Sequence, residues 1–284
     1  MAKKKTKRVA IQGGYGAFHE IAAMHYFGND TIEIVPALTF KDLFHSLKMQ
    51  KADLGIMAIE NSLAGSILPN YGLLMESKMK IIGEIYLRIK QNLVALPGQK
   101  IKDLKEVYSH PVAILQCQKF FDQYPKIKLI ESNDTALSAR DIRVNNRKGI
   151  GAIASTLAAK NYKLEILGKS IETNKMNYTR FLILSEKHDD IKKVKNPDKS
   201  SITFDLQHKT GSLSKILSIL SYYNMNLTKI QSMPIIGKNW EYQFYADLSF
   251  EDYTTYQQAL NAIRPFTSKL IILGEYHKGK TIIE

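Results

Sequence analysis

The sequence predicts an α/β region with largely parallel sheets, followed by a smaller α+β domain. Three observations support this division. Strand and helix patterns alternate through residues 8–185, as they do in α/β proteins. A charged stretch with Pro197 and Asp198 follows at residues 186–200 and is predicted to be an interdomain linker. Residues 201–278 then show the order βαββαβ, which is typical of the ferredoxin-like supersecondary pattern.

Apolar runs predict the strands of the first region, and helical patterns lie between them. The expected strands are 8–12, 31–38, 54–60, 81–97 (interpreted as two strands or one long bent one), 127–132, 149–155 and 177–185. The expected helices are 17–27, 39–51, 110–125, 133–145 and 156–162. Capping residues and a first-turn proline support them, namely Thr39, Pro111, Asn133 or Asp134, and Ser155 or Thr156. The sheet edges near residues 86–96 suggest that the chain crosses to a second lobe and returns, which would leave a cleft between two lobes.

The second domain is predicted from the same kinds of pattern. Its expected strands are 201–207, 227–236, 240–250 and 268–277, and its expected helices are 211–224 and 253–266. The helix 211–224 is amphipathic, with one apolar face formed by Leu213, Ile216, Leu217 and Leu220. The two central strands are expected to join around Gly237, Lys238 and Asn239.

The composition is that of a globular protein. The chain has 284 residues, 44% of them hydrophobic, which suits a soluble protein of about two domains. No run approaches the roughly 18 apolar residues that a membrane helix needs. The basic start, Met1 to Arg8, lacks the apolar core and cleavage site of a signal peptide. Cys117 is the only cysteine, so no intrachain disulfide can form, and we expect a cytoplasmic location.

The chain is basic, with a formal net charge of +13. Much of the excess lies in the N-terminal tail and in the expected linker. No zinc-finger spacing, RNA-recognition motif or aromatic-basic interleaving accompanies it, so we expect neither a nucleic-acid partner nor a membrane partner. A small anionic substrate fits the charge equally well, and most of the lysines are expected to be solvated surface.

A glycine-rich turn follows the first strand in the segment RVAIQGGYGAFHEIAA. A dinucleotide fingerprint needs a third glycine where His19 stands and an acid at the end of the second strand, whereas Glu33 lies inside that strand. A P-loop needs Gly-Lys-Ser/Thr at its close, which this segment lacks. What remains is a tight turn at a helix start, whose backbone N–H groups around Gly14, Tyr15 and Gly16 could bind an anion. A purely structural turn explains the stretch equally well.

Two other stretches carry polar residues near a strand end or a helix start. Asn61 and Ser62 follow the strand 54–60, where a ligand crevice commonly lies, although such residues also end strands. Ser109 and His110 precede a helix, where Ser109 suits an N-cap as well as a ligand contact. No Ser-His-Asp arrangement can be assigned from order, and no cluster has metal-ligand spacing, so no metal site is predicted.

The stretch NKMNYTRFLIL combines a hydroxyl and a cation at the start of a strand. Alternation places Thr179 on one face with Asn177 and Phe181, and places Arg180 on the other. This pair is unusual in a core and reasonable in a site. An edge-of-strand threonine beside a solvated arginine explains it equally well.

Together, these stretches resemble the motifs of the prephenate dehydratase family. IENSLAGS is similar to its E-N-S-x-x-G motif, YSHPVAILQC to S-H-P-Q-A-x-x-Q-C, and NYTRF to N-x-T-R-F. NDTALSAR and AIASTLAAKNYKLEIL are similar to its D-T-A and A-I-A-S segments. The tail GSLSKILSILSYYNMNLTKIQSMP resembles the amino-acid-binding regulatory module called ACT. The likeness covers about residues 8–278, and five short motifs in the right order make chance agreement very unusual.

The resemblance implies a two-lobed catalytic region, like type II periplasmic binding proteins, at residues 8–185 and an ACT domain at 201–278. It implies a lyase that converts prephenate to phenylpyruvate, carbon dioxide and water in phenylalanine synthesis, without a cofactor. Thr179 is the expected catalytic hydroxyl and Arg180 the expected carboxylate partner, although strand parity counts against both facing one ligand. The other substrate-binding residues that the motifs imply are Gly14, Tyr15, Gly16, Asn61, Ser62, Gly65, Ser109, His110, Ser155, Asn177 and Phe181.

The sequence departs from the family pattern in two places. In the first turn the family has G-P-x-G-T-F-S, and here Gly14, Ala17 and His19 replace the proline, the threonine and the serine. His19 either supplies the donor of the lost hydroxyl or faces away from the site. In the ACT-like tail, Gln231 and Met233 stand where E-S-R-P is usual, which puts effector binding in question.

The ACT resemblance also implies phenylalanine as a feedback inhibitor, bound at an interface of a homo-oligomer that is at least a dimer. The implied effector-binding residues are Gly211, Ser212, Leu213, Asn226, Leu227, Gln231 and Ser232. Two other functions stay open. One is arogenate dehydration, whose substrate has an amino group where prephenate has a keto group, and the other is non-catalytic ligand sensing.

Overall fold

The chain divides into two compact units in a computed structural model that describes residues 6–235, 237 and 241–283. The first unit contains the residues up to Leu73, then Ile85–Leu182, and the residues from Lys280. The second unit contains Leu74–Glu84 and Ile183–Gly279. Each unit therefore consists of segments that are far apart in the sequence.

The boundaries between the units differ from the single linker that was expected. Two strands, β5 (Lys80–Arg88) and β11 (Tyr178–Ser185), contribute residues to both units. Residues 186–200 contain helix α7 (His188–Lys192) and the start of strand β12 (Lys199–Leu206). At these two points the chain passes from one unit to the other within a strand, and the charged stretch is partly regular structure.

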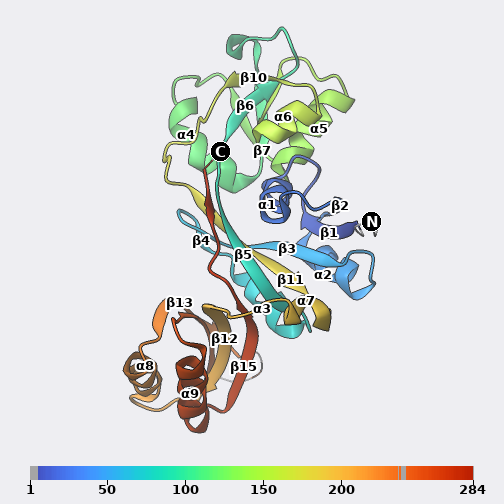
Figure 1. The fold of residues 1–284 in the computed structure, drawn as a ribbon. Helices are drawn as coiled ribbons and strands as arrows, with labels where there is room; N and C mark the ends of the chain where they lie inside the picture. Colours follow the sequence, from blue (N-terminus) through green and yellow to red (C-terminus); the bar gives the residue numbers. More distant parts are fainter. Residues whose placement is uncertain (1–5, 236, 238–240, 284) are drawn as a thin grey trace. The chain divides into compact units, whose positions relative to one another are not determined.

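The first unit contains two sheets (Figure 1). Its first sheet has the order β2-β1-β3-β11-β5, and β1 (Lys7–Gln12) is parallel to both β2 (Ile32–Ala37) and β3 (Leu54–Asn61). Two short strands, β4 (Gly65–Ser66) and β16 (Thr281–Ile282), pair with β3 and β5. Helix α1 (Phe18–Phe27) connects β1 to β2, α2 (Phe40–Lys48) connects β2 to β3, and α3 (Leu68–Glu76) follows β4.

The second sheet of this unit has the order β10-β6-β9-β7-β8. Strand β7 (Glu106–Ser109) is parallel to β8 (Lys128–Glu131) and to β9 (Ile150–Ala154). Strand β6 (Asn92–Ala95) runs antiparallel to both β9 and β10 (Glu165–Gly168). The expectation of largely parallel sheets is therefore wrong for this half of the sheet, because β6 enters directly from β5 without a crossover helix.

Helices cover both faces of the second sheet (Figure 1). Helices α5 (Thr135–Val144) and α6 (Thr156–Asn161) pack on one face, where the core contains Val94, Ala152, Ala154, Ala139 and Ala158. Helix α4 (Pro111–Phe121) packs on the other, where the core contains Leu93, Ala95, Ile153, Cys117 and Phe121. Neighbouring residues of one strand alternate between the two cores, as strand geometry requires. A short 3-10 turn, Ile101–Asp103, precedes β7.

The predicted capping residues set where these helices begin. Thr39 forms a capping box with Asp42 at the start of α2, with its hydroxyl oxygen 3.1 Å from the Asp42 amide. Of the paired alternatives, Asp134 caps α5 and Ser155 caps α6. Pro111 is the first residue of α4, where its missing N–H leaves no bond unmade.

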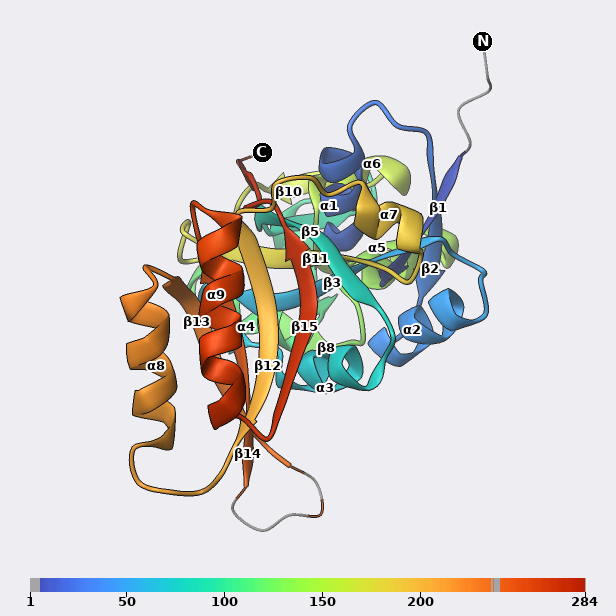
Figure 2. The same ribbon diagram turned by 60° about the horizontal axis from the view of Figure 1, so that its bottom comes forward.

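The second unit has the order βαββαβ that the sequence predicts. Its sheet order is β13-β14-β12-β15, and all three pairings are antiparallel. Helices α8 (Ser212–Tyr222) and α9 (Tyr253–Ile263) lie side by side on one face of this sheet (Figure 2). The strands β13 (Asn226–Pro234), β14 (Tyr242–Ser249) and β15 (Lys269–Tyr276) complete the unit. Within the expected turn, Gly237 has a positive φ of 83°, whereas Lys238 and Asn239 lie outside the described residues.

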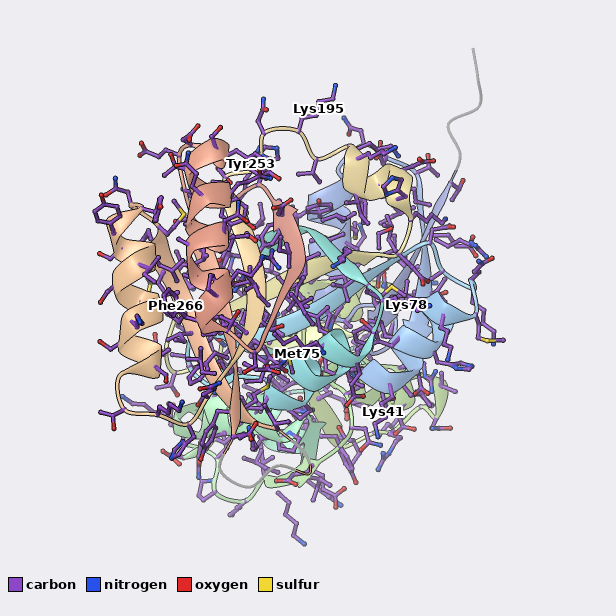
Figure 3. All side chains as sticks on the ribbon, turned by 90° about the horizontal axis from the view of Figure 1, so that it is seen from below. Lys41, Met75, Lys78, Lys195, Tyr253 and Phe266 are labelled. Carbon is purple, nitrogen blue, oxygen red and sulfur yellow. The ribbon has the colours of Figure 1, made fainter. Side chains whose placement is uncertain are left out.

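The core of the second unit lies between this sheet and the two helices. Ile216 and Leu220 of α8 are buried in this core and Leu213 packs against it, as predicted. Leu217 is not part of this core, and Ile219 packs against it instead. The 3-10 turn Arg264–Phe266 follows α9 and ends at Phe266, which Figure 3 labels. Lys215 of α8 places its Nζ 4.1 Å from the ring centroid of Phe266. No helix in the described part of the chain is long and apolar enough to span a membrane.

Candidate active site

A cavity of about 300 Å³ lies within the first unit, lined by residues that follow strands of both of its sheets. This is the cleft that the two-lobed organisation predicts. The wall is largely apolar and includes Phe40, Ile89 and Phe181. The polar lining residues are Gln12, His19, Asn61, Gln91, His110, Gln116, Asn133, Asp134, Thr135 and Thr179. Among the described residues that line it there is no lysine or arginine.

Three helices begin at this cavity. The first residues of α1, α4 and α5 all line it, together with their N-caps, Ala17, His110 and Asp134. The N-cap of α1 makes no side-chain hydrogen bond, and the backbone N–H groups of Phe18 and His19 have no partner within the described chain. Helix N-termini carry a partial positive charge and favour anions. The start of α1 therefore offers backbone donors to an anion, although the described lining has no cationic side chain.

The end of β3 and the start of β11 form a fixed hydrogen-bond network. Asn61 Oδ1 accepts from the backbone N–H groups of Leu63 and Ala64, at 3.0 and 2.9 Å. Because an N–H group can only donate, this fixes the orientation of the amide and turns Nδ2 toward β11. Nδ2 lies 2.7 Å from Asn177 Oδ1 and 3.0 Å from Thr179 Oγ1. Asn61 thus joins the two polar residues predicted on this face of β11, Asn177 and Thr179.

The same network extends to a glutamine that the sequence did not single out. Asn177 is fully buried, and its Nδ2 donates to Gln116 Oε1 at 2.9 Å. Gln116 lies in the motif YSHPVAILQC, so its position in that motif is the signal that could have found it. The hydrogen-bonded series Gln116–Asn177–Asn61 therefore fixes the position of the Thr179 hydroxyl.

This network leaves the Thr179 hydroxyl as a donor. Its oxygen accepts from Asn61, and no acceptor for its hydrogen is found among the described residues. A hydroxyl whose oxygen already accepts a hydrogen bond is polarised and donates more strongly. Thr179 is 9% exposed and lines the cavity, so its hydrogen is available to a bound molecule. Phe181 lines the cavity from the same strand face, as the alternation predicts.

Arg180 does not line the cavity, so the predicted role of this residue as a carboxylate partner is not supported. Side chains alternate along β11, and Arg180 projects to the face opposite Thr179. It is 3% exposed, and its guanidinium carbon lies 6.0 Å from the ring centroid of Tyr86. Arg180 and Thr179 therefore lie on opposite faces of β11, as strand alternation in the sequence predicts.

The glycine turn packs against other helices and does not line the cavity, which corrects the site prediction for Gly14, Tyr15 and Gly16. The Gly14 N–H lies 3.4 Å from Asp134 Oδ1, and the Gly16 N–H lies 2.5 Å from Glu20 Oε2, so neither amide is open to an anion. Tyr15 is 50% exposed. The amides of this segment that have no partner among the described residues are instead those of Phe18 and His19, at the start of α1.

The glycines serve close packing. A Cβ at Gly14 would lie 2.7 Å from Leu137 Cδ2. A Cβ at Gly16 would lie 2.5 Å from Ala158 Cα, and Gly16 also has a φ of +90°. Only glycine fits both conditions at position 16.

Four other predicted site residues have structural partners outside the cavity lining. Ser62 Oγ donates to the Met176 carbonyl and accepts from the Tyr178 amide. Ser109 Oγ donates to the Ile153 carbonyl, and Ser155 caps α6 and donates to the Gly16 carbonyl. Gly65 is the first residue of the short strand β4, where its φ is +81°. The three serines hold backbone segments in place through these bonds. The local sequence does not distinguish this role from ligand binding.

His19 lines the cavity, which answers the question that the sequence left open. Its ring is 8% exposed and makes edge contacts with Phe181 and Phe40, at centroid distances of 4.9 and 5.6 Å. Nε2 accepts from the Ala58 amide at 3.3 Å. Burial lowers the pKa of His19 to about 3, so the imidazole is neutral at neutral pH.

We expect this buried imidazole to make the fold sensitive to acid. The unfolded chain protonates His19 near pH 6.5, whereas the folded chain resists protonation, so the unfolded state binds more protons below that pH. Between pH 7.5 and 5.0 the His19 contribution to the free energy of unfolding falls by about 2 kcal/mol. Urea denaturation of the wild type and of His19→Gln at both pH values measures it. Equal losses of stability in the two proteins would contradict the prediction.

His110 and Asp134 are the other titratable groups of the lining. His110 Nδ1 accepts from the Val112 amide at 3.3 Å, and burial lowers the pKa of His110. Burial raises the pKa of Asp134, against the opposing effect of the backbone N–H groups of Leu137 and Gly14 that bond to its carboxylate. Both side chains are thereby tied to helix starts. No group of three or more His, Cys, Asp or Glu side chains in the described ranges could hold a metal ion.

The predicted effector residues lie at two ends of the second unit. A hollow of about 420 Å³ is lined by the loop before α8, by Ser212 and Leu213, and by Tyr242 and Phe244 of β14. Gly211, at the N-cap of α8, has a φ of +81°. Antiparallel pairing places Ser232 opposite Phe244 but Asn226 opposite Ser249. The further predicted residues Leu227 and Gln231 lie along the same strand, so one copy of the chain does not bring Asn226 and Leu227 to this hollow.

A ligand-sized cavity with a fixed hydroxyl and three helix starts makes the first unit a small-molecule site in an α/β protein. A family model described as prephenate dehydratase matches residues 9–189. A relative from Arabidopsis thaliana, named arogenate dehydratase/prephenate dehydratase 1, is 36% identical over 95% of this chain and 71% of its own length. The chain belongs to the prephenate dehydratase family, and its chemistry is therefore that of a lyase in aromatic amino-acid synthesis.

Two solved structures resemble the whole chain. The prephenate dehydratase of Arthrobacter aurescens, in complex with L-Phe, is 25% identical with a TM-score of 0.84, covering 95% of this chain and 90% of that one. A structure described as a novel type of quorum-quenching acylase is 29% identical with a TM-score of 0.85, covering 96% of this chain and 98% of that one. Both likenesses extend across the two units.

Proposed function

We propose that this protein removes the ring carboxylate and the ring hydroxyl of prephenate together, giving phenylpyruvate, carbon dioxide and water. The observation that carries the proposal is the Thr179 hydroxyl, held by Asn61 from behind and left as a donor at the cavity. The family supports the reaction type. The departing oxygen needs a hydrogen-bond donor, and Thr179 is placed to supply one.

The reaction moves an electron pair from the bond to the ring carboxylate, through the ring, to the departing oxygen. The bond between the ring and its carboxylate breaks, and the electron pair enters the ring. The bond between the ring and its hydroxyl then breaks with its electron pair, and the resulting hydroxide takes a proton from solvent. Aromaticity makes the products stable, so the protein needs only to orient the dianion and stabilise the departing oxygen.

The two kinds of wall suit the two carboxylates of prephenate. The side-chain carboxylate is kept in the product, and the start of α1, with its unpartnered Phe18 and His19 amides, suits a permanent anion. The ring carboxylate leaves as neutral carbon dioxide, and an apolar wall such as Phe40 and Phe181 favours loss of its charge. Positive helix ends replace the arginine that the sequence suggested.

Incubation of the purified protein with prephenate tests this function. Phenylpyruvate formation, followed by its absorbance in alkali, is the expected result. The same assay with arogenate, followed by phenylalanine formation, measures the alternative substrate, which the name of the Arabidopsis relative also includes. Absence of product from both substrates would refute the enzyme and favour a ligand sensor.

We further propose that the second unit is an ACT domain that binds phenylalanine. The support is its βαββαβ order, the hollow beside Ser212 and Leu213, and the bound L-Phe named for the Arthrobacter structure. This chain has Gln231 and Met233 where the usual motif has an acid and an arginine. Recognition then depends on backbone groups at the glycine N-cap of α8 and on apolar contact.

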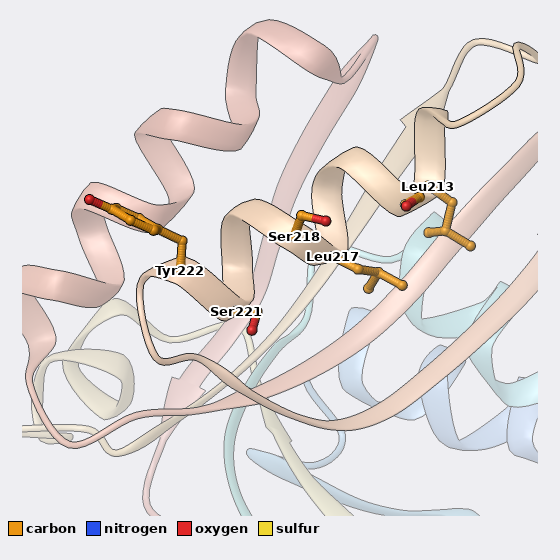
Figure 4. A pocket seen from close by; sticks show the side chains of 6 residues that line it. Leu213, Leu217, Ser218, Ser221 and Tyr222 are labelled. Carbon is orange, nitrogen blue, oxygen red and sulfur yellow. The ribbon is translucent and has the colours of Figure 1, made fainter.

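A pair of chains would complete this effector site. Strand β13 is the outer edge of the sheet in the second unit, and the neighbouring face of α8 carries half-buried Leu217 and exposed Tyr222 beside an open hollow (Figure 4). Antiparallel pairing of two β13 edges around a two-fold axis would place the second copy's Asn226 near the Pro234 end of this strand. Light scattering should give at least twice the 32.3 kDa of one chain. A mass of one chain would refute the pair.

Phenylalanine is expected to inhibit the enzyme through this domain. Activity should fall by more than half at saturating phenylalanine, and Leu213→Ala should weaken the inhibition about ten-fold, because it removes apolar contact. Activity without phenylalanine should stay unchanged in this variant. A phenylalanine titration of both proteins measures the effect, and flat activity in the wild type would contradict it.

A further inference from the structure

The first turn of α1 holds a histidine whose protonation pattern is fixed by the backbone. The Ala58 N–H lies 3.3 Å from His19 Nε2 and can only donate, so Nε2 is the acceptor. A neutral imidazole carries its single proton on the other nitrogen. His19 therefore has its N–H at Nδ1.

This Nδ1–H group has no acceptor in the part of the chain that the structure describes, although the residue is more than nine-tenths buried and lines the cavity. Its ring is held on two sides by Phe40 and Phe181. Phe181 lies two residues after Thr179 on the same strand face, so the ring of His19 touches the neighbour of the catalytic hydroxyl. Both unsatisfied donors, Nδ1–H and the Thr179 hydroxyl, belong to one cavity.

We propose that His19 is a second catalytic donor, whose Nδ1–H group bonds to the departing oxygen of the substrate beside the Thr179 hydroxyl. The inference rests on the proposed function, since the reaction supplies the departing oxygen. His19 gives a hydrogen bond and keeps its proton. The ring–oxygen bond breaks with its electron pair, and the hydroxide takes its proton from solvent, so the protein is unchanged after each turnover.

A neutral donor suits this position. The elements packed against the ring contribute Phe40, Phe181 and the Ala58 amide, and none of these groups titrates. The titratable groups that share the cavity are His110 and Asp134. A preorganised donor in a water-poor cavity stabilises the charge that develops in the transition state more than the charge of the bound substrate. We therefore expect His19 to affect kcat more than KM.

Replacement of one atom separates this role from a structural one. Nδ-methylhistidine at position 19 keeps the Nε2 acceptor for Ala58 and removes only the Nδ1–H donor. We expect kcat to fall about 100-fold with the acceptor bond intact. His19→Gln, whose amide offers both an acceptor and a donor, should recover part of the loss. His45, exposed on α2, provides the matched control for the same replacement.

A kcat within three-fold of the wild type in the Nδ-methylhistidine protein would overturn the proposal. The wild-type assay separates this failure from that of the proposed function, because absence of turnover on prephenate and arogenate refutes the reaction itself. A long-range proton–nitrogen NMR spectrum of histidine-labelled protein adds a readout without turnover. His19 should show a protonated Nδ1 and an unprotonated Nε2 from pH 5 to 8. A protonated Nε2 would also overturn the proposal.

Discussion

Thr179→Val should lower kcat by about 1,000-fold, because it removes the cavity-lining hydroxyl that we propose as the donor to the departing oxygen. Valine has nearly the same shape, and the side chain is 9% exposed, so the cavity should keep its form. The assay is steady-state turnover of prephenate, or of arogenate if that is the substrate. In this variant the Asn61 amide loses its bond to Thr179 but keeps its bonds to Asn177 and to the Tyr178 carbonyl, which limits the loss of stability.

Thr179→Ser is the matched control, because it keeps the hydroxyl and loses only a methyl group. Its kcat should stay within about ten-fold of the wild type. Thermal unfolding of both variants separates a loss of chemistry from a loss of fold. A valine variant that retains a fifth of the wild-type kcat would remove Thr179 from the mechanism.

Gly16→Ala should be the most destabilising single-methyl change in the first turn. The added Cβ would meet the Ala158 backbone at 2.5 Å, and the positive φ adds strain of its own. We expect the free energy of unfolding to fall by about 4 kcal/mol, as judged by urea denaturation. Helix α6 cannot move away freely, because Ser155 at its N-cap bonds to the Gly16 carbonyl.

Gly65→Ala is the control that isolates the backbone strain. Gly65 has a similar φ of +81°, but nothing lies within 4 Å of the position of its Cβ. Its free energy of unfolding should fall by only about 1 kcal/mol. Equal losses in the two variants would show that close packing against α6 contributes nothing.

The sequence predicts those helix starts that are determined by residues close together in the chain. Thr39 and Ser155 mark helix starts through bonds to backbone three positions on, and Pro111 marks one because it has no N–H to satisfy. The sequence therefore displays the cause directly. The antiparallel course of β6 was missed because strand pairing joins Asn92 to Ala154, which no local signal records. The helix α3 was also missed, since Pro69 and Gly72 interrupt its pattern.

The sequence motifs and the cavity coincide where a residue both lies in a motif and lines the cavity. Asn61 and Thr179 meet these conditions, although they are 118 positions apart. Ser62, Ser109 and Ser155 lie in motifs but bond to backbone, and only the fold shows which way they turn. Arg180 shows the converse, since strand parity already argued against the role that its charge suggested. The orientation of His19 required the Ala58 amide, which belongs to another strand.

The helix starts at the cavity have a consequence for how this protein tolerates mutation. A backbone N–H group is present whichever residue occupies the position, with proline as the exception. Substitution at Phe18 can therefore alter the shape of the wall and leave in place the amide that we propose binds the substrate carboxylate. Comparison of sequences would show variation at these positions and suggest that they are dispensable, although the charge complementarity of the site is carried by the main chain there.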